Sequence, residues 1–212
     1  MREADNIREV ESTIANSCVP SVASDQRSSA SLFLMGFIFW PKSSRYVIER
    51  PAYLPTQCKR VGVFVDEDIE TVRRIANDYA LDYIQLHGHE SSAYCAQLQE
   101  LHLIKAISVS GREDIVTYKQ YEGLVDYFLF DTMCPTGGGS GQHFDWNVLS
   151  AYDGRTPFLL SGGIGPDDAQ CLSAFRHKKC IGIDLNSRFE IGPGLKDIDK
   201  LRTFLNAINN GK

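Results

Sequence analysis

The sequence predicts an α/β fold built on a parallel sheet, and three observations predict it. Seven short apolar runs are nearly continuous in hydrophobicity, which is typical of strands covered on both faces. Amphipathic segments with helical spacing lie between these runs. The 212 residues are enough for a substantial core and fit one domain, 1–212. Alternation of strand and helix within one domain indicates a (β/α) barrel or a doubly wound sheet.

The predicted strands share a richness in β-branched and aromatic residues. They are expected at residues 35–40, 61–65, 83–86, 103–106, 127–130, 158–160 and 181–185. Seven strands are one fewer than an eight-stranded barrel contains. A predicted helix opens the chain, and the sequence shows no strand before it.

The predicted helices share an apolar stripe on one face. They are expected at residues 4–14, 69–79, 91–101, 166–175 and 196–208. The fourth helix begins with Pro166 and two acids, a pattern that favours a helix N-terminus. Residues 15–30 are rich in serine and lack a periodic apolar pattern, so we expect a flexible insert there. The segment 48–60 carries two prolines and has room for at most a short helix.

The composition excludes several classes of protein. A formal net charge of -5, with 43% hydrophobic and 23% charged residues, is ordinary for a soluble globular protein and leaves no basic surface for nucleic acid. The apolar runs are too short to cross a membrane, and the N-terminus is too charged for a signal peptide. We therefore expect a cytoplasmic protein with neither a nucleic-acid partner nor a membrane partner.

The cysteines and histidines do not form a metal-binding pattern. The cysteines are scattered without CxxC pairs, which favours reduced thiols over a disulfide framework or a zinc site. They are Cys18, Cys58, Cys95, Cys134, Cys171 and Cys180. His87 and His89 are close in sequence but have no ligand cluster beside them. We expect no metal site.

Polar residues follow several of the predicted strands. Asp131 ends the strand at 127–130 and precedes a glycine-dense loop at 137–141, and His87 directly follows the strand at 83–86. In a barrel the carboxyl ends of the strands converge on one rim, which holds the active site. The sequence therefore predicts Asp131 at an active-site rim.

A second glycine-rich turn follows the strand at 158–160. Gly162 and Gly163 stand in SGGIGP, which leads into the next predicted helix, and Asn186 and Ser187 follow the last strand. Backbone N–H groups at such turns bind a phosphate dianion without a lysine. Barrels often bind phosphate at their last strands, so this pair of turns predicts a phosphate site.

These motifs together resemble the phosphoribosylanthranilate isomerase family. The matching segments, in chain order, are MGFIFWPKSSRYV, KRVGVFV, IQLHGHE, LIKAI, YFLFDT, GGGSGQHFDW, LLSGGIGPDD and IDLNSRFEIGPGLKD. The resemblance runs from about Met35 to the C-terminus and includes the first helix. It implies a single TIM-type (β/α)8 barrel that needs no metal and no organic cofactor.

The resemblance also implies a reaction. N-(5-phosphoribosyl)anthranilate would undergo an Amadori rearrangement to 1-(2-carboxyphenylamino)-1-deoxyribulose 5-phosphate, a step of tryptophan biosynthesis. A general acid protonates the furanose oxygen, and a base removes the proton from ribose C2. The small-molecule partner is therefore a phosphoribosyl substrate.

Individual residues take roles from this resemblance. Asp131 matches the general acid, and Arg45 matches an arginine that binds the anthranilate carboxylate. His87 either lines the pocket or holds its own loop, and Asp184, expected inside the last strand, either orients substrate or satisfies buried polar groups. The residues implied in phosphate binding are Gly141, Gly162, Gly163, Asn186 and Ser187.

The chain departs from the family at its first strand. Family members begin with a K-x-C-G strand whose cysteine is the general base, and Met1 aligns just after that motif. Cys18 lies in the serine-rich segment, outside any strand pattern. We therefore expect a barrel whose first strand is missing or replaced, and a reduced isomerase activity for this chain.

Other interpretations remain open at this point. Indole-3-glycerol-phosphate synthase would need catalytic lysine and glutamate at several strand ends, and only Lys105 is suitably placed. A metal-dependent sugar-phosphate epimerase would need His and Asp ligands on successive strands, and the sequence lacks them. A barrel remnant that binds phosphoribosyl ligands without converting them is the alternative outside enzymes. The oligomeric state is expected to be a monomer or a homodimer.

Overall fold

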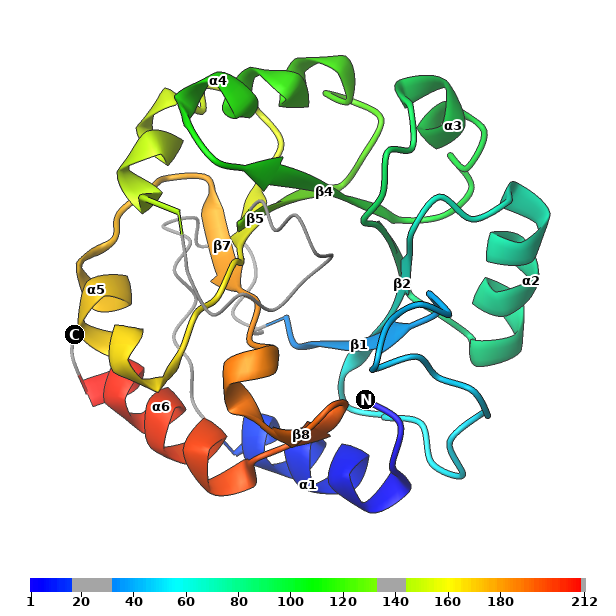
Figure 1. Ribbon diagram of the computed structural model, residues 1–212, viewed down its shortest axis with the longest axis vertical. Helices are drawn as coiled ribbons and strands as arrows, with labels where there is room; N and C mark the ends of the chain where they lie inside the picture. The colour runs from blue at the N-terminus through cyan, green and yellow to red at the C-terminus, as the bar shows by residue number, and fades with distance from the viewer. Residues whose placement is uncertain (17–31, 133–143, 211–212) are drawn as a thin grey trace.

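Seven parallel strands form one curved sheet in chain order, from β1 to β7 (Figure 1). The computed structural model describes residues 1–16, 32–132 and 144–210. The strands are β1 (Leu34–Ile38), β2 (Lys59–Phe64), β3 (Tyr83–Leu86), β4 (Leu103–Val109), β5 (Tyr127–Thr132), β6 (Phe158–Leu160) and β7 (Cys180–Ile183). The predicted parallel sheet is therefore confirmed, with seven strands in the described part of the chain.

The helices lie outside the curved sheet (Figure 1). The α-helices are α1 (Ala4–Ala15), α2 (Ile69–Tyr79), α3 (Ser92–Ala96), α4 (Arg112–Ile115), α5 (Ala169–Ala174) and α6 (Ile198–Asn210). The 3-10 helices are η1 (Val116–Gln120), η2 (Trp146–Ala151), η3 (Pro166–Asp168) and η4 (Ser187–Phe189). Helix α6 packs against both α1 and α5, so the two ends of the chain meet on one side of the barrel.

Several predicted elements differ from the observed ones in length. The helix predicted at 91–101 ends at Ala96, and the one predicted at 196–208 begins at Ile198. The second difference has a clear cause, because Leu195 and Lys196 form β9 (Leu195–Lys196), which pairs antiparallel with β8 (Glu190–Gly192). This small hairpin was not predicted from the sequence.

Two hydrophobic clusters flank the sheet. The larger cluster fills the layer between the strands and the helices and contains fully buried rings such as Phe37, Phe128 and Phe158. The smaller cluster lies on the inner face and consists of Val61, Ile104, Ala106 and Leu129. Strands with apolar residues on both faces explain the nearly continuous hydrophobic runs.

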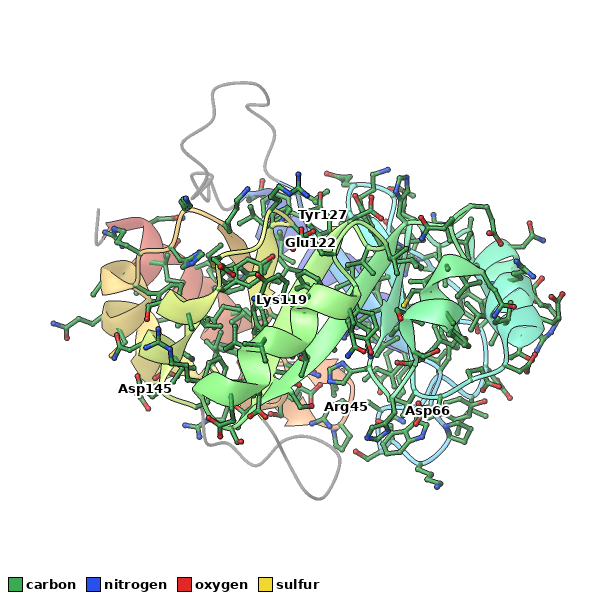
Figure 2. The ribbon with its side chains drawn as sticks, turned by 90° about the horizontal axis from the view of Figure 1, so that it is seen from above. Arg45, Asp66, Lys119, Glu122, Tyr127 and Asp145 are labelled. Carbon is green, nitrogen blue, oxygen red and sulfur yellow. The ribbon has the colours of Figure 1, made fainter. Side chains whose placement is uncertain are left out.

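The carboxyl ends of the strands share one end of the barrel. Arg45 and Asp66, which follow β1 and β2, lie along the lower edge of Figure 2, while Tyr127 at the start of β5 lies near the upper edge. Asp131 lies within β5 rather than after it, because the strand extends through Thr132. Asp184, predicted inside the last strand, is the first residue after β7.

Two expectations fall on residues outside the described ranges. Ala15 belongs to α1, and the rest of the segment expected as an insert after Asn16 lies outside them. Gly141, expected at the phosphate, also lies outside them. Among the helices that the structure describes, none has the length and apolar character needed to cross a membrane.

Candidate active site

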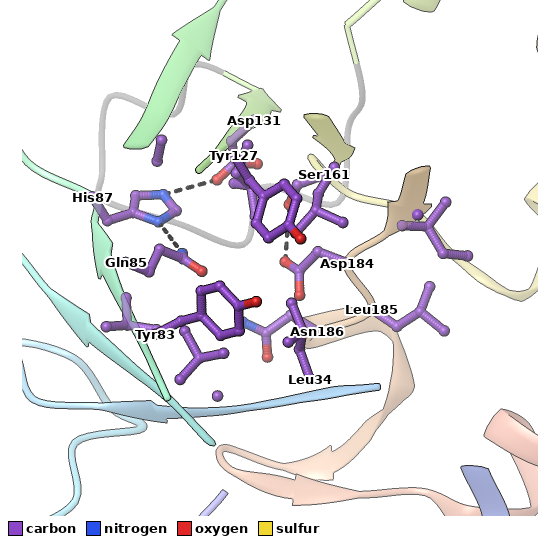
Figure 3. A pocket seen from close by; sticks show the side chains of 18 of the residues that line it. Leu34, Tyr83, Gln85, His87, Tyr127, Asp131, Ser161, Asp184, Leu185 and Asn186 are labelled. Atoms are coloured by element: carbon purple, nitrogen blue, oxygen red, sulfur yellow. Dashed lines mark hydrogen bonds and ion pairs between the residues drawn. The ribbon is translucent and has the colours of Figure 1, made fainter. Parts of the chain in front are cut away.

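A cavity of about 2380 Å³ is lined by residues of the barrel interior and also by residues of the outer helices, such as α1, α5 and α6. Tyr83 and Tyr127, at the amino ends of β3 and β5, line one part of it, and Asp131 and Asp184, at the carboxyl ends of β5 and β7, line another (Figure 3). The interior of a closed barrel is normally filled by side chains. The cavity thus gives a ligand room at the rim that the sequence predicts as the active site.

Asp131 is held at this rim by His87. The imidazole Nε2 of His87 lies 3.0 Å from Oδ2 of Asp131, and the backbone N–H of Thr132 donates to Oδ1 at 2.9 Å. On its other side, Nδ1 of His87 lies 2.8 Å from the amide nitrogen of Gln85. The three side chains form a row across the cavity wall from β3 to β5 (Figure 3). Both side chains of the His87–Asp131 pair keep part of their surface exposed, 29% and 23%.

Gln85 was not among the predicted site residues. Side chains two residues apart on a strand point to the same face, so Gln85 and His87 both face the interior. The same alternation places Tyr127, Leu129 and Asp131 on the inner face of β5. The spacing of two residues between Gln85 and His87 was the feature of the sequence that could have identified Gln85 as a site residue.

Asp184 forms the opposite side of the site. The hydroxyl of Ser161, at the end of β6, donates to its Oδ2 at 2.9 Å. Burial raises the pKa of Asp184, and the negative charge of Asp131 raises it further, against opposing effects of Lys196 and Ser161. A carboxyl with a raised pKa retains its proton to higher pH than an exposed aspartate.

Lys196 extends the site toward the last hairpin. Its ammonium donates to the side-chain oxygen of Asn186 at 2.9 Å and to the carbonyl oxygens of Leu185 and Asn186. Burial lowers its pKa, although Glu190 and Asp184 both favour the charged form. The sequence predicts Lys196 as the first residue of a helix, so it does not predict that Lys196 lies at the site.

Arg45 contacts Glu190 across the rim. Nε and Nη2 of Arg45 both lie 2.8 Å from Oε2 of Glu190, whose side chain is 4% exposed. Burial opposes ionisation of Glu190, but the hydrogen bond from Arg45 and the charge of Lys196 outweigh it and hold its pKa below the usual value. Arg45 lines the cavity, so the structure brings it to the site together with a carboxylate that the sequence analysis did not include.

The predicted phosphate turns lie on neighbouring strands. β6 pairs with β7, which places the turn at Gly162 and Gly163 beside Asn186 and Ser187. The φ angles of Gly162 and Gly163 are +90° and +72°, a region that favours glycine. A Cβ at Gly162 would also clash with Oγ1 of Thr132. Both glycines are therefore required by the backbone itself.

Lys105 points away from the barrel interior. The inner positions of β4 are Ile104 and Ala106, and Lys105 lies between them on the outer face. Its side chain is 3% exposed, and its ammonium donates to Glu90 at 2.8 Å. Lys105 thus stabilises the loop between β3 and α3.

The described cysteines lie away from the carboxyl-end rim. Cys58 and Cys180 stand at the amino ends of β2 and β7, and Cys95 and Cys171 stand on helices α3 and α5. Burial raises the pKa of Cys58, Cys95 and Cys180 to about 11. Cys18 and Cys134 lie outside the described residues. Within the described ranges, no group of three or more His, Cys, Asp or Glu residues is arranged to hold a metal ion.

The sequence model of one protein family matches residues 17–207. Its description is N-(5'-phosphoribosyl)anthranilate (PRA) isomerase. Two curated relatives named N-(5'-phosphoribosyl)anthranilate isomerase are also similar. The one from Phocaeicola vulgatus is 46% identical over 210 residues, covering 98% of this chain and 94% of the relative. The one from Parabacteroides distasonis is 48% identical over 216 residues, covering 98% of this chain and 90% of the relative.

Solved structures show the same fold. The crystal structure of phosphoribosyl anthranilate isomerase from Thermotoga maritima matches with a TM-score of 0.76 and 29% identity, and the match covers 99% of each chain. A phosphoribosyl anthranilate isomerase in complex with reduced 1-(o-carboxyphenylamino)-1-deoxyribulose 5-phosphate matches with a TM-score of 0.72 and 26% identity, covering 99% of each chain. The predicted TIM-type barrel is therefore confirmed.

Proposed function

The chain belongs to the phosphoribosylanthranilate isomerase family, and from this premise we propose its reaction and the roles of its residues. The reaction is the conversion of N-(5'-phosphoribosyl)anthranilate to 1-(2-carboxyphenylamino)-1-deoxyribulose 5-phosphate, in tryptophan biosynthesis. The observation that carries the proposal is the His87–Asp131 pair at the carboxyl end of β5, facing Asp184 across the cavity.

The chemistry needs an acid and a base. Protonation of the furanose oxygen lets the C1–O bond break, and a protonated Schiff base remains between C1 and the anthranilate nitrogen. Loss of the proton from C2 then gives an enolamine, which takes a proton at C1 and loses one from the C2 hydroxyl to become the ketone. Asp131 is the general acid in this proposal, because it lies at the rim with part of its surface open to the cavity.

Asp184 serves as a second carboxyl at the site. Because burial raises its pKa, it remains protonated more readily than an ordinary aspartate and can donate a hydrogen bond to a ribose oxygen. Ser161 fixes the position of that carboxyl. Asp184 therefore orients the substrate, while Asp131 transfers a proton.

The two ends of the substrate carry anionic groups. Arg45 binds the anthranilate carboxylate, for which a planar guanidinium is suited, and Glu190 holds the guanidinium in place until substrate enters. The N–H groups of Gly162 and Gly163, with Asn186 and Ser187, bind the phosphate. Positive φ angles at both glycines and the pairing of β6 with β7 support this assignment.

The alternatives receive different support. A synthase that uses Lys105 as an acid is disfavoured because this lysine lies on the outer face of β4 and pairs with Glu90. A barrel that binds phosphoribosyl ligands without converting them stays as the other prediction from the sequence; Cys58, Cys95, Cys171 and Cys180 lie away from the carboxyl-end rim, and Cys18 and Cys134 lie outside the described residues. We therefore keep the non-catalytic barrel as the second candidate.

Two measurements on the purified chain separate these candidates. Calorimetric titration with reduced 1-(o-carboxyphenylamino)-1-deoxyribulose 5-phosphate measures binding, and a turnover assay with N-(5'-phosphoribosyl)anthranilate measures conversion. An isomerase binds the analogue and converts the substrate, and a reduced rate agrees with our expectation for this chain. Binding without any conversion would establish the non-catalytic barrel. Absence of both would contradict the proposed function.

Assembly and location stay as predictions. One related crystal structure, from Thermotoga maritima, is of mutually generated monomers of dimeric phosphoribosylanthranilate isomerase, so both states occur for that relative. For this chain we propose a monomer or a homodimer in the cytoplasm, with the phosphoribosyl substrate as its small-molecule partner.

A further inference from the structure

His87 lies between two side chains that determine which of its nitrogens carries the proton. We propose that Gln85 and His87 are positioning residues for Asp131: Gln85 holds His87 in the tautomer protonated on Nε2, and that N–H orients the carboxyl group of Asp131 toward the substrate. The inference rests on the proposed function, since it assigns these roles around the proposed general acid.

The tautomer follows from the contact with Gln85. The amide nitrogen of Gln85 lies 2.8 Å from Nδ1 of His87, and an amide NH₂ group only donates hydrogen bonds. Nδ1 must therefore accept, which leaves the ring proton of neutral His87 on Nε2. That nitrogen is the one 3.0 Å from Oδ2 of Asp131, so the ring donates to the carboxyl group (Figure 3).

This direction of donation matters for a general acid. A His87 ring with its lone pair on Nε2 would accept the proton of Asp131 and compete with the substrate for it. A ring that donates from Nε2 has no lone pair there, so His87 does not compete with the substrate as a proton acceptor. Together with the N–H of Thr132, which donates to Oδ1, His87 also fixes the plane of the carboxyl group.

The backbone on both sides of His87 is fixed by a buried ion pair. The ammonium of Lys105 donates to the carbonyl oxygen of Leu86 at 3.2 Å and to that of Gly88 at 2.8 Å, which are the two chain neighbours of His87. Glu90, 1% exposed, pairs with the same ammonium at 2.8 Å and accepts from the N–H of Gly88. The N–H of His87 itself donates to the carbonyl of Phe64 at 2.8 Å. The ring is therefore presented to Asp131 from a rigid loop.

The first test is spectroscopic and does not depend on turnover. The full chain is labelled with ¹⁵N at its five histidines, and the signals of His87 are identified by their loss in His87→Gln. We expect a protonated Nε2 and an unprotonated Nδ1 in the wild type, and a mixture of tautomers in Gln85→Leu. A wild-type ring protonated on Nδ1 would overturn the inference, whatever the chain catalyses.

The second test is kinetic and uses matched side chains. The amide nitrogen of glutamine can replace Nε2 of histidine, whereas that of asparagine is too short to reach Asp131. We expect kcat of His87→Asn to fall roughly 10- to 100-fold, as for removal of one hydrogen-bond partner from the Asp131 carboxyl group, with little change in KM. His87→Gln should retain most of kcat.

A control on the same loop completes the design. His89 is 98% exposed and contacts Asp66 rather than the cavity acid, so His89→Gln should leave kcat unchanged. Equal kcat values in the wild type, His87→Asn and His87→Gln would contradict the positioning role. A wild type without any turnover would contradict the proposed function instead, and the tautomer measurement would still decide the inference.

Discussion

At the residue scale, two carboxyl groups face one cavity from different surroundings. Asp131 accepts hydrogen bonds from His87 and from the N–H of Thr132. Asp184 is surrounded more closely, and burial together with the charge of Asp131 raises its pKa. Pairs of titratable groups in such unequal surroundings commonly divide the tasks of a site. This difference underlies our assignment of proton transfer to Asp131 and of orientation to Asp184.

Asp184→Asn is expected to stabilise the fold at neutral pH while slowing turnover. Because the pKa of Asp184 is higher in the folded state, the folded chain binds the proton more tightly than the unfolded chain. The free energy of unfolding therefore falls as the pH rises from the ordinary aspartate pKa to the raised pKa of the folded state. The amide side chain of the variant does not ionise and so lacks that fall. Urea unfolding of both proteins below the ordinary aspartate pKa of about 4 and near neutral pH measures the difference.

The control for this prediction is Asp199→Asn. Asp199 is 89% exposed on helix α6, where it pairs with Arg202. Its replacement should change the free energy of unfolding little at either pH. The raised pKa of Asp184 would be refuted if the wild type became more stable, relative to Asp184→Asn, as the pH rose.

The sequence predicts which side chains lie at the rim, but not which side chains they contact there. Asp131, Arg45, His87 and Asp184 all line the cavity, because polar residues at strand ends stand out from apolar runs. The partners, such as Gln85 and Glu190, could not be identified in the same way. Contacts such as Arg45 with Glu190 join residues far apart in sequence and depend on how distant elements pack.

At the element scale, helix α1 is tied to the segment before β2 by one buried carboxylate. Glu11, 2% exposed, accepts hydrogen bonds from the hydroxyl of Tyr53 and from the N–H groups of Thr56, Gln57 and Cys58. Burial opposes its ionisation, but these donors outweigh burial and lower its pKa. The proline-containing segment, for which we expected at most a short helix, is thus held by this contact instead of by helical hydrogen bonds.

Glu11→Gln is expected to lower the free energy of unfolding by about 1.5–3 kcal/mol at neutral pH, since charge-assisted hydrogen bonds are lost. The pKa of Glu11 is lower in the folded state, so its contribution is present above the ordinary glutamate range and is lost as pH falls through the lowered value. Urea unfolding at neutral and acidic pH tests both statements. Glu9→Gln on the exposed face of the same helix is the control. Equal stability of wild type and Glu11→Gln at neutral pH would contradict this view of the contact.

Element boundaries were predicted well where periodicity alone decides them. The predicted limits of α2 and β3 match the structure, because α2 has a clear apolar stripe and Ala80 at its C-cap adopts a left-handed conformation that ends the helix. The segment predicted as a helix at 91–101 is shorter, since its chain turns after Ala96. The hairpin of β8 and β9 depends on pairing between short segments, which periodicity does not reveal.

At the scale of the whole molecule, the order of the strands determines where chemistry can occur. Parallel strands in chain order from β1 to β7 bring all their carboxyl ends to one rim. That topology follows from the alternation of strands and helices, so the fold class was accessible from the sequence. The extent of the cavity was not, because it depends on how far the side chains of opposite strands reach across the interior.

The same topology explains why separate motifs form one site. Asp131 on β5, the glycine turn after β6 and Asn186 after β7 follow three consecutive neighbours in the sheet. Loops at the last strands of barrels commonly bind phosphate, and we propose that the acid on β5 meets the sugar of the phosphoribosyl ligand. The proposed function therefore depends above all on Asp131 as the acid of an isomerase.

The measurement that tests this role most directly is kcat of the wild type and of Asp131→Asn with N-(5'-phosphoribosyl)anthranilate. The asparagine keeps the size of the side chain and loses the transferable proton, so we predict a fall in kcat of about 10²- to 10⁴-fold with binding of the product analogue retained. An Asp131→Asn protein with the kcat of the wild type would contradict the role of Asp131 as the general acid.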